Sequence, residues 1–226
     1  MRSEQTLPLV GAPSHATAAP GVNRVLRDTY RLLSATLLFS VAATAASAAF
    51  KLPHPGLILT LVGFFGLLYA TTKLRNSAWG LAAVFGLTGF MGYALGPIVS
   101  HYLAMPNGHQ TVMMAMGGTG AIFVGLSVYA MASRRDFSFM GGFLLAGILV
   151  AFLAGLGAIF FEVPALSLTV SAAFVLLMAG LILFETSRII HGGETNYIMA
   201  TVSLYVSIYN LFSSLLALIG FGSSSD

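Results

Sequence analysis

The stretch of sequence from Ser138 to Phe161 reads SFMGGFLLAGILVAFLAGLGAIFF and contains no charged residue. Crossing the hydrocarbon core of a bilayer takes about 20 mainly apolar helical residues, because the core is roughly 30 Å thick and each residue rises 1.5 Å. The stretch is long enough and apolar enough to meet this requirement. It therefore predicts a membrane-spanning α-helix.

Six further stretches of the same kind lie on either side of it. They are Leu32–Phe50, Gly56–Thr72, Ala78–Ser100, Thr111–Ser133, Ala165–Glu185 and Ile198–Gly220. Prolines and glycines, which interrupt helices, stand in several of the breaks between them. The segments of about ten alternating residues that are typical of a membrane β-barrel do not occur. We therefore expect an all-α integral membrane protein with seven transmembrane helices.

The composition supports the same conclusion. Of the 226 residues, 57% are apolar and 8% are charged, and the mean hydropathy is +0.90. Soluble domains carry about 25% charged residues, so this chain lacks the polar surface to stay in water and we expect the lipid bilayer to surround it. The absence of cysteine excludes disulfides, thiol catalysis and Cys-ligated metals. The basic residues form no run that would indicate nucleic-acid binding.

The basic residues instead predict the orientation of the chain. If the N-terminus is cytoplasmic, only Lys51 of the ten Lys and Arg residues falls outside. The other nine, which fall inside, are Arg2, Arg24, Arg27, Arg31, Lys73, Arg75, Arg134, Arg135 and Arg188. Because basic residues concentrate in cytoplasmic loops, we expect a cytoplasmic N-terminus and, after seven crossings, a periplasmic C-terminus. A last span that re-enters instead of crossing would return the C-terminus to the inside.

Residues 1–23 differ from the seven-helix domain that we assign to residues 24–226. They are rich in Pro, Ala, Ser and Thr, and we expect them to form a disordered cytoplasmic tail. Ala46-Ser47-Ala48 resembles a signal-peptide cleavage site, but the apolar run begins too late for a signal peptide. We interpret the small side chains of Ala42–Ala49 as a surface that another helix approaches closely.

The third span contains a second small-residue face. Gly86, Gly89, Gly92 and Gly96 recur in it at helical spacing, and such a face lets helices pack closely in lipid. Pro97 follows directly, and because proline removes a helix hydrogen bond we expect the helix to kink or end there.

No catalytic or metal motif stands out. None of the five histidines has a second histidine at the i, i+4 spacing of a helical zinc motif. The sequence also lacks a Gly-x-Ser-x-Gly nucleophile elbow and a phosphate-binding glycine loop. We therefore expect no enzyme, no catalytic residues, no bound metal and no cofactor.

Polar residues near the C-terminus are the remaining candidates for a site. Glu185 and Arg188 are three residues apart on one helix face, in the favourable acid-before-base order. They form either a simple interfacial ion pair or, since ionisable groups in membranes are costly and often functional, a cation or proton site. In the seventh span a polar stripe, Ser203, Ser207, Asn210 and Ser214, follows helical spacing. It either bonds to other helices or lines a narrow polar path.

The same part of the chain resembles the C-terminal signature of the Bax inhibitor-1 family. The matching segments are Phe184-Glu185-Thr186-Ser187, Ile189–Tyr197, Ser203-Leu204-Tyr205 and Asn210-Leu211-Phe212. The resemblance covers nearly all of the chain after about residue 24. Within the family, it is strongest to a bacterial inner-membrane branch that modulates the FtsH protease.

This resemblance implies six helices around a central seventh. Some family members are pH-sensitive calcium leak pathways gated by two carboxylates on the last two spans, and the resemblance places those positions at Glu185 and Ser207. A possible ion or proton site would thus contain Glu185, Ser207 and Asn210. Because Ca²⁺ prefers 6–8 oxygen ligands, usually with several carboxylates, the serine at position 207 argues against calcium as a partner.

Two classes of function follow from the resemblance and the residues. The favoured one is a non-enzymatic inner-membrane regulator that binds the FtsH protease complex and modulates proteolysis of membrane proteins. Its tail would serve as a protease handle that starts with Met1, Arg2, Ser3, Glu4 and Gln5. The alternative is a pH-sensitive leak channel for calcium or protons that uses Glu185 and the polar stripe.

Overall fold

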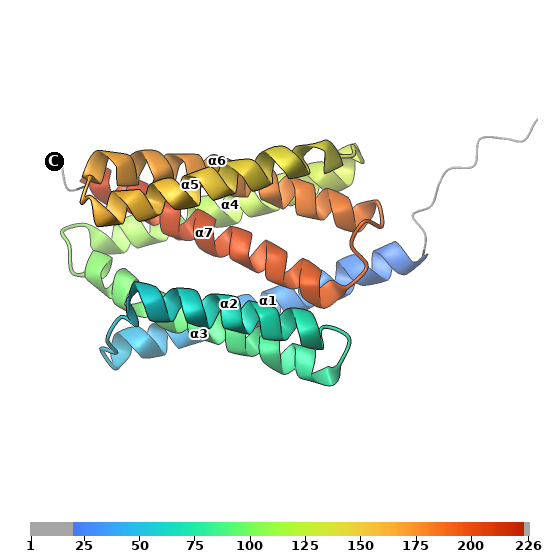
Figure 1. The fold of residues 1–226 in the computed structure, drawn as a ribbon, viewed down its shortest axis with the longest axis horizontal. Helices are drawn as coiled ribbons and strands as arrows, with labels where there is room; N and C mark the ends of the chain where they lie inside the picture. Colours follow the sequence, from blue (N-terminus) through green and yellow to red (C-terminus); the bar gives the residue numbers. More distant parts are fainter. Residues whose placement is uncertain (1–19, 224–226) are drawn as a thin grey trace, which may run out of the picture.

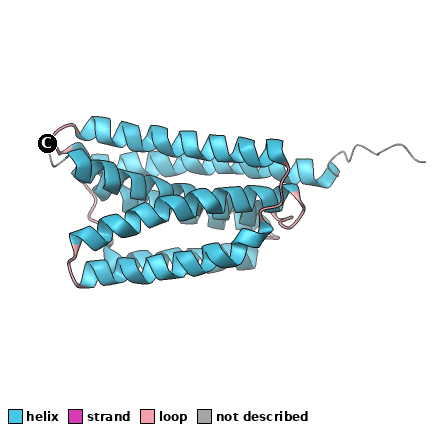
Figure 2. Ribbon diagram, turned by 90° about the horizontal axis from the view of Figure 1, so that it is seen from above, coloured by secondary structure: helices cyan, strands magenta, loops and turns pink. Residues whose placement is uncertain are grey.

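The computed structural model describes residues 20–223, which form seven long helices (Figures 1 and 2). The helices are α1 (Pro20–Ala49), α2 (Gly56–Leu74), α3 (Ala78–Leu103), α4 (Gly108–Ser133), α5 (Gly141–Phe160), α6 (Pro164–Ile190) and α7 (Tyr197–Ser223). A short 3₁₀ turn, Ser138–Met140, precedes α5. All seven helices are long and apolar enough to cross a membrane, which confirms the predicted class. The predicted handle, Met1 to Gln5, lies outside the described residues and stays a prediction.

The helices α1 and α6 extend furthest beyond their predicted apolar stretches. α1 begins at Pro20, so it includes the last four residues of the range assigned to the tail and the charged residues that follow. Arg24 and Asp28 stabilise this polar turn as an i, i+4 ion pair at 3.7 Å. α6 continues to Ile190, so Glu185 lies within a helix and not at its end. Hydropathy detects the part of a helix that lies in lipid, and both helices continue beyond that part.

α7 occupies the centre of the bundle, as the family resemblance implied (Figure 1). It packs against α1 and α3 on one side and against α4 and α6 on the other. The outer helices are α2, which packs against α3, and α5, which packs against α6. Four helices therefore contact the central one, and two lie at the periphery.

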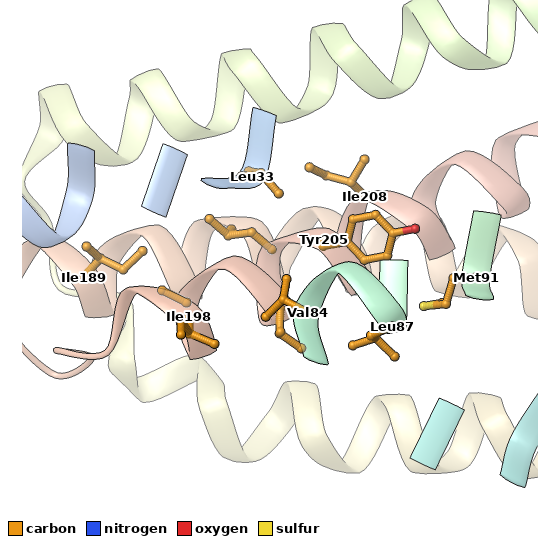
Figure 3. Close-up of a cluster of buried hydrophobic side chains, with 11 residues drawn as sticks. Leu33, Val84, Leu87, Met91, Ile189, Ile198, Tyr205 and Ile208 are labelled. Carbon is orange, nitrogen blue, oxygen red and sulfur yellow. The ribbon is translucent and has the colours of Figure 1, made fainter. Parts of the chain in front are cut away.

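The main apolar core lies where α1, α3, α6 and α7 meet (Figure 3). Leu33, Val84, Leu87 and Ile189 are almost fully buried there, together with the Tyr205 ring of α7. In lipid the drive for this packing comes from close van der Waals contact and hydrogen bonds, because lipid tails are as apolar as the side chains. The central helix is thus held by close fit on several sides.

The helices α1 and α3 pack closely along a seam, formed by Ser40, Thr44 and Ser47 against Gly92 and Gly96. A Cβ atom at position 92 would overlap the Ser40 carbonyl oxygen, and one at position 96 would overlap the Ser47 side chain. Thr44 Oγ1 donates to the carbonyl oxygen of Gly92 at 2.9 Å. The predicted small-residue faces of the first and third spans therefore pack against each other.

The helix α3 continues through Pro97 to Leu103. Of the two predicted outcomes at the proline, an end of the helix or a kink, the first therefore does not occur. Proline has no N–H, which deprives the carbonyl oxygen of Tyr93, four residues earlier, of its helical partner. Ser47 Oγ donates to that oxygen at 2.9 Å from α1. The seam thus replaces the hydrogen bond that Pro97 removes.

Candidate functional site

Five basic residues gather at the end of the bundle where α2, α4 and α6 end, which we call the basic end. They are Lys73, Arg75, Arg134, Arg135 and Arg188. The described chain also begins at this end, at the right of Figure 1. The polar residues of the C-terminal signature lie here, on the last turns of α6 and the connection to α7.

Arg188 joins two carboxylates at the basic end. Its Nη1 lies 3.4 Å from Glu185 Oε2 and its Nη2 lies 3.7 Å from Glu194 Oε2. Its guanidinium also lies over the Phe184 ring, 5.5 Å from the centroid. The Glu185 side chain is only 8% exposed, whereas that of Arg188 is 33% exposed. The carboxylate is therefore largely withdrawn from solvent and faces a cation that already neutralises it.

The last turn of α6 holds the connection between α4 and α5. Ser187 Oγ accepts the backbone N–H of Phe137 at 3.0 Å. The His191 ring lies between two carbonyl oxygens, with Nδ1 at 2.9 Å from Ser187 and Nε2 at 3.2 Å from Arg134. The ring therefore links the last turn of α6 to the end of α4.

Asn196 holds the connection between α2 and α3 in the same manner. Its Oδ1 caps α7 by accepting the backbone N–H groups of Ile198 and Met199 at 3.0 and 3.1 Å. Its Nδ2 donates to the carbonyl oxygen of Arg75 at 3.2 Å and to Asn76 Oδ1 at 2.9 Å. Ser187, His191 and Asn196 therefore tie together all three connections at the basic end, and we call this set the loop junction.

Asp136 adds one exposed acidic group beside the loop junction. The Ser138 hydroxyl donates to its carboxylate and, together with the Ser138 backbone N–H at 2.8 Å, lowers the pKa of Asp136. Because the pKa in the folded protein is below that of the unfolded chain, the contribution to stability is present above the unfolded pKa. It is lost as the pH falls through the folded value.

The polar stripe of α7 bonds mainly within its own helix. Ser207 Oγ donates to the Ser203 carbonyl oxygen at 2.9 Å, and Asn210 Nδ2 donates to that of Val206 at 2.8 Å. Among the described residues, no hydrogen bond joins Glu185 to Ser207 or Asn210. The structure therefore brings Glu185 to Arg188 and does not join the three residues of the proposed ion or proton site.

The shortest hydrogen bond from α7 to another helix among the described residues is made by Tyr205. Its hydroxyl lies 2.6 Å from Ser40 Oγ of α1 and donates to the Thr88 carbonyl oxygen of α3 at 3.2 Å. Tyr205 has no role predicted from the sequence beyond its place in the family signature. Its ring centroid lies 6.4 Å from that of Tyr209, one turn further along α7. The sequence did contain a signal for this contact. A tyrosine hydroxyl in an apolar span needs a hydrogen-bond partner within the protein, because lipid offers none.

Five buried hydroxyl groups in the described part of the chain have no hydrogen-bond partner, and all but that of Ser213 lie toward the basic end of their helices. These four belong to Thr29 and Tyr30 of α1, Ser127 of α4 and Thr186 of α6. Buried polar groups normally have a partner, so each of the four retains an unused capacity for a hydrogen bond. The described residues contain no group of three or more His, Asp or Glu side chains arranged to hold a metal.

Comparison with known proteins places the whole fold in a recognised group. The family model described as "Inhibitor of apoptosis-promoting Bax1" matches residues 22–225. The chain is 51% identical over 215 residues to the modulator of FtsH protease YccA of Escherichia coli K12, covering 95% of this chain and 98% of that protein. The same figures hold for the inner membrane protein YccA of Escherichia coli O6:H1. An uncharacterised protein of Pseudomonas aeruginosa is 52% identical over 205 residues, covering 91% and 92% of the two chains.

Proposed function

The chain belongs to the Bax inhibitor-1 family, and from its similarity to YccA we propose that it is an inner-membrane regulator of the FtsH protease. In this role it binds the protease complex and modulates the proteolysis of membrane proteins without being an enzyme itself. The observation that carries the proposal is the extent of the match, because 51% identity spans almost the full length of both chains. A shared function is more consistent with such a match than a shared fold alone.

The proposed orientation places the basic end in the cytoplasm. Lys73, Arg75, Arg134, Arg135 and Arg188 all lie at this end, and cytoplasmic loops carry the excess of basic residues. The loop junction then faces the cytoplasm together with the N-terminal segment. We propose that the protease complex contacts this side of the protein and grips the N-terminal handle that begins at Met1.

The contacts of Glu185 favour regulation over conduction. A permeating cation would have to compete with Arg188 for the carboxylate, because the guanidinium lies 3.4 Å from it. The hydroxyl of Ser207 and the amide of Asn210 donate to their own helix. One observation supports a cation or proton leak as the second candidate, namely the four unpaired hydroxyls near the basic end.

Binding to the protease is tested with the tagged full-length chain in bacterial membranes. FtsH should co-purify with it, and overproduction should lengthen the half-life of a membrane-protein substrate of the protease. Deletion of residues 2–11 should leave co-purification intact but slow degradation of the regulator itself. An absence of FtsH from the purified complex, together with an unchanged substrate half-life, would contradict the proposal.

The Glu185→Gln variant separates the two candidate functions. A regulator should retain FtsH binding, because the substitution keeps the shape of the side chain and leaves Arg188 its contact with Glu194. The parent protein in liposomes should show weak or no flux of calcium and protons. Robust flux in the parent that disappears in Glu185→Gln would establish the leak pathway instead.

A further inference from the structure

An apolar cleft of about 470 Å³ lies between α1 and α4, with α7 as its floor and with Leu95, Val99 and Leu103 of α3 also lining it. Val41 of α1 and Met116 of α4, which are 54% and 52% exposed, flank its mouth, whereas Tyr205 and Ile208 at its floor are buried. Ligand sites in proteins usually have volumes of about 300–1,000 Å³. The cleft is therefore large enough to hold a ligand and deep enough to reach the central helix.

The cleft is open toward the surrounding bilayer. α1 packs on α3 and α7, and α4 packs on α6 and α7, so the two helices that form its walls belong to different halves of the bundle (Figure 1). Its walls run from Leu37 to Ala48 on α1 and from Val112 to Phe123 on α4. The α1 segment and most of the α4 segment lie in the halves of their helices that point away from the basic end. A molecule that enters the cleft must come from the lipid phase.

The length and volume of the cleft match those of an acyl chain. Each wall is about 17 Å long at 1.5 Å per residue, which is close to the roughly 15 Å of hydrocarbon in one leaflet. A methylene chain about 4–5 Å wide, as carbon contact distances require, would need about 200–330 Å³ over that length. The available volume therefore accommodates an acyl chain.

The charge at the open end of the cleft suits a phospholipid. Ala48 lines the cleft, and Lys51, which is exposed, follows just beyond the end of α1. A lysine at a membrane interface attracts a phosphate group. We propose that the cleft binds one acyl chain of a glycerophospholipid from the leaflet at this end of the bundle, with the phosphate near Lys51.

The proposal is tested with the full-length protein in vesicles of phosphatidylethanolamine and phosphatidylglycerol. A small fraction of the phosphatidylglycerol carries a diazirine near the end of one acyl chain, and mass spectrometry maps the adducts after illumination. Bulk lipid reaches the peripheral helices in any case, whereas Tyr205 and Ile208 in the middle of α7 are buried and line the floor of the cleft. Wild-type protein should therefore show adducts on α7 around Ile208 and Phe212.

Two glycines of α4 provide a matched pair of variants. An added Cβ at Gly120, which lines the cleft, or at Gly125, which does not, would meet nothing within 4 Å. Gly120→Phe should reduce the labelling of α7 several-fold, and Gly125→Phe should leave it unchanged. If Gly120→Phe does not fold, as judged by circular dichroism, Val41→Phe at the mouth replaces it.

Three results would overturn the proposal. The first is an absence of adducts on α7 in the wild-type protein. The second is α7 labelling that neither Gly120→Phe nor Val41→Phe reduces. The third is labelling in purified vesicles that is lost in native membranes, because a protein segment would then occupy the cleft. The assay does not involve FtsH, so its failure leaves the proposed regulation intact.

Discussion

The seam between α1 and α3 and the loop junction at the basic end use the same kind of bond in different surroundings. In both, polar side chains donate to backbone carbonyl oxygens of another segment, as Thr44 does to Gly92 and Asn196 does to Arg75. The seam lies within the membrane-spanning part, where a group that loses its partner finds no water. The junction lies at the end of the bundle, where water replaces a lost bond. Removing the same kind of hydrogen bond should therefore lower the free energy of unfolding more in the seam than at the loop junction.

The largest effect is expected from closing the space in the seam. Gly92→Ala places a Cβ against the carbonyl oxygen of Ser40, and backbone cannot move aside as easily as a side chain. The free energy of unfolding should fall by about 1–3 kcal/mol, measured by SDS titration in mixed micelles. Gly125→Ala, where the added Cβ meets open space, should change it by no more than about 0.5 kcal/mol. Equal losses in both variants would contradict the prediction that the Cβ at position 92 clashes with the α1 backbone.

A smaller effect is expected from removing the hydroxyl that links α7 to the seam. Tyr205→Phe deletes the bonds to Ser40 and Thr88 and keeps the buried ring. Bonds between membrane helices contribute about 0.6 kcal/mol each on average, so the loss should be about 1–2 kcal/mol in the same titration. Tyr209→Phe is the matched control, because its hydroxyl makes no hydrogen bond among the described residues. A loss in Tyr209→Phe as large as that in Tyr205→Phe would contradict this assignment.

The smallest effect is expected at the loop junction. Asn196→Ala removes the cap of α7 and the link to the α2–α3 connection. Caps contribute about 0.5–2 kcal/mol, and because water reaches this end we expect a loss near 0.5 kcal/mol. Asn76→Ala, which removes only the link to Asn76 Oδ1, should cost less. If Asn196→Ala costs more than Gly92→Ala, the junction and not the seam dominates stability.

Much of the seam was predictable from the sequence, because spacing alone places small residues on one helix face. Gly92 and Gly96 were expected to allow close packing, as were the small residues of Ala42–Ala49, and they face one another. The link from Tyr205 to Ser40 was not predicted, because it joins residues 165 positions apart. Periodicity describes each helix separately and does not say which helices are neighbours.

The loop junction was less predictable for a related reason. The sequence showed Glu185 and Arg188 on one face, since both lie on one helix three residues apart. In the α2–α3 and α4–α5 connections, the partners of Ser187, His191 and Asn196 are backbone groups, apart from Asn76 Oδ1. A backbone carbonyl has no signature in the sequence, so only the folded chain reveals these bonds. The helical turns beyond the apolar runs were missed because charged residues lower the local hydropathy.

The hydrogen bond from Ser47 to the Tyr93 carbonyl predicts how positions 47 and 97 vary among relatives. The serine is useful to the third helix because the proline leaves the Tyr93 carbonyl without an internal donor. A relative that replaces the proline with alanine regains that donor and frees position 47 to change. A relative that keeps the proline but loses the serine must supply a different donor from the first helix. The two positions should therefore covary during evolution, although 50 residues of sequence separate them.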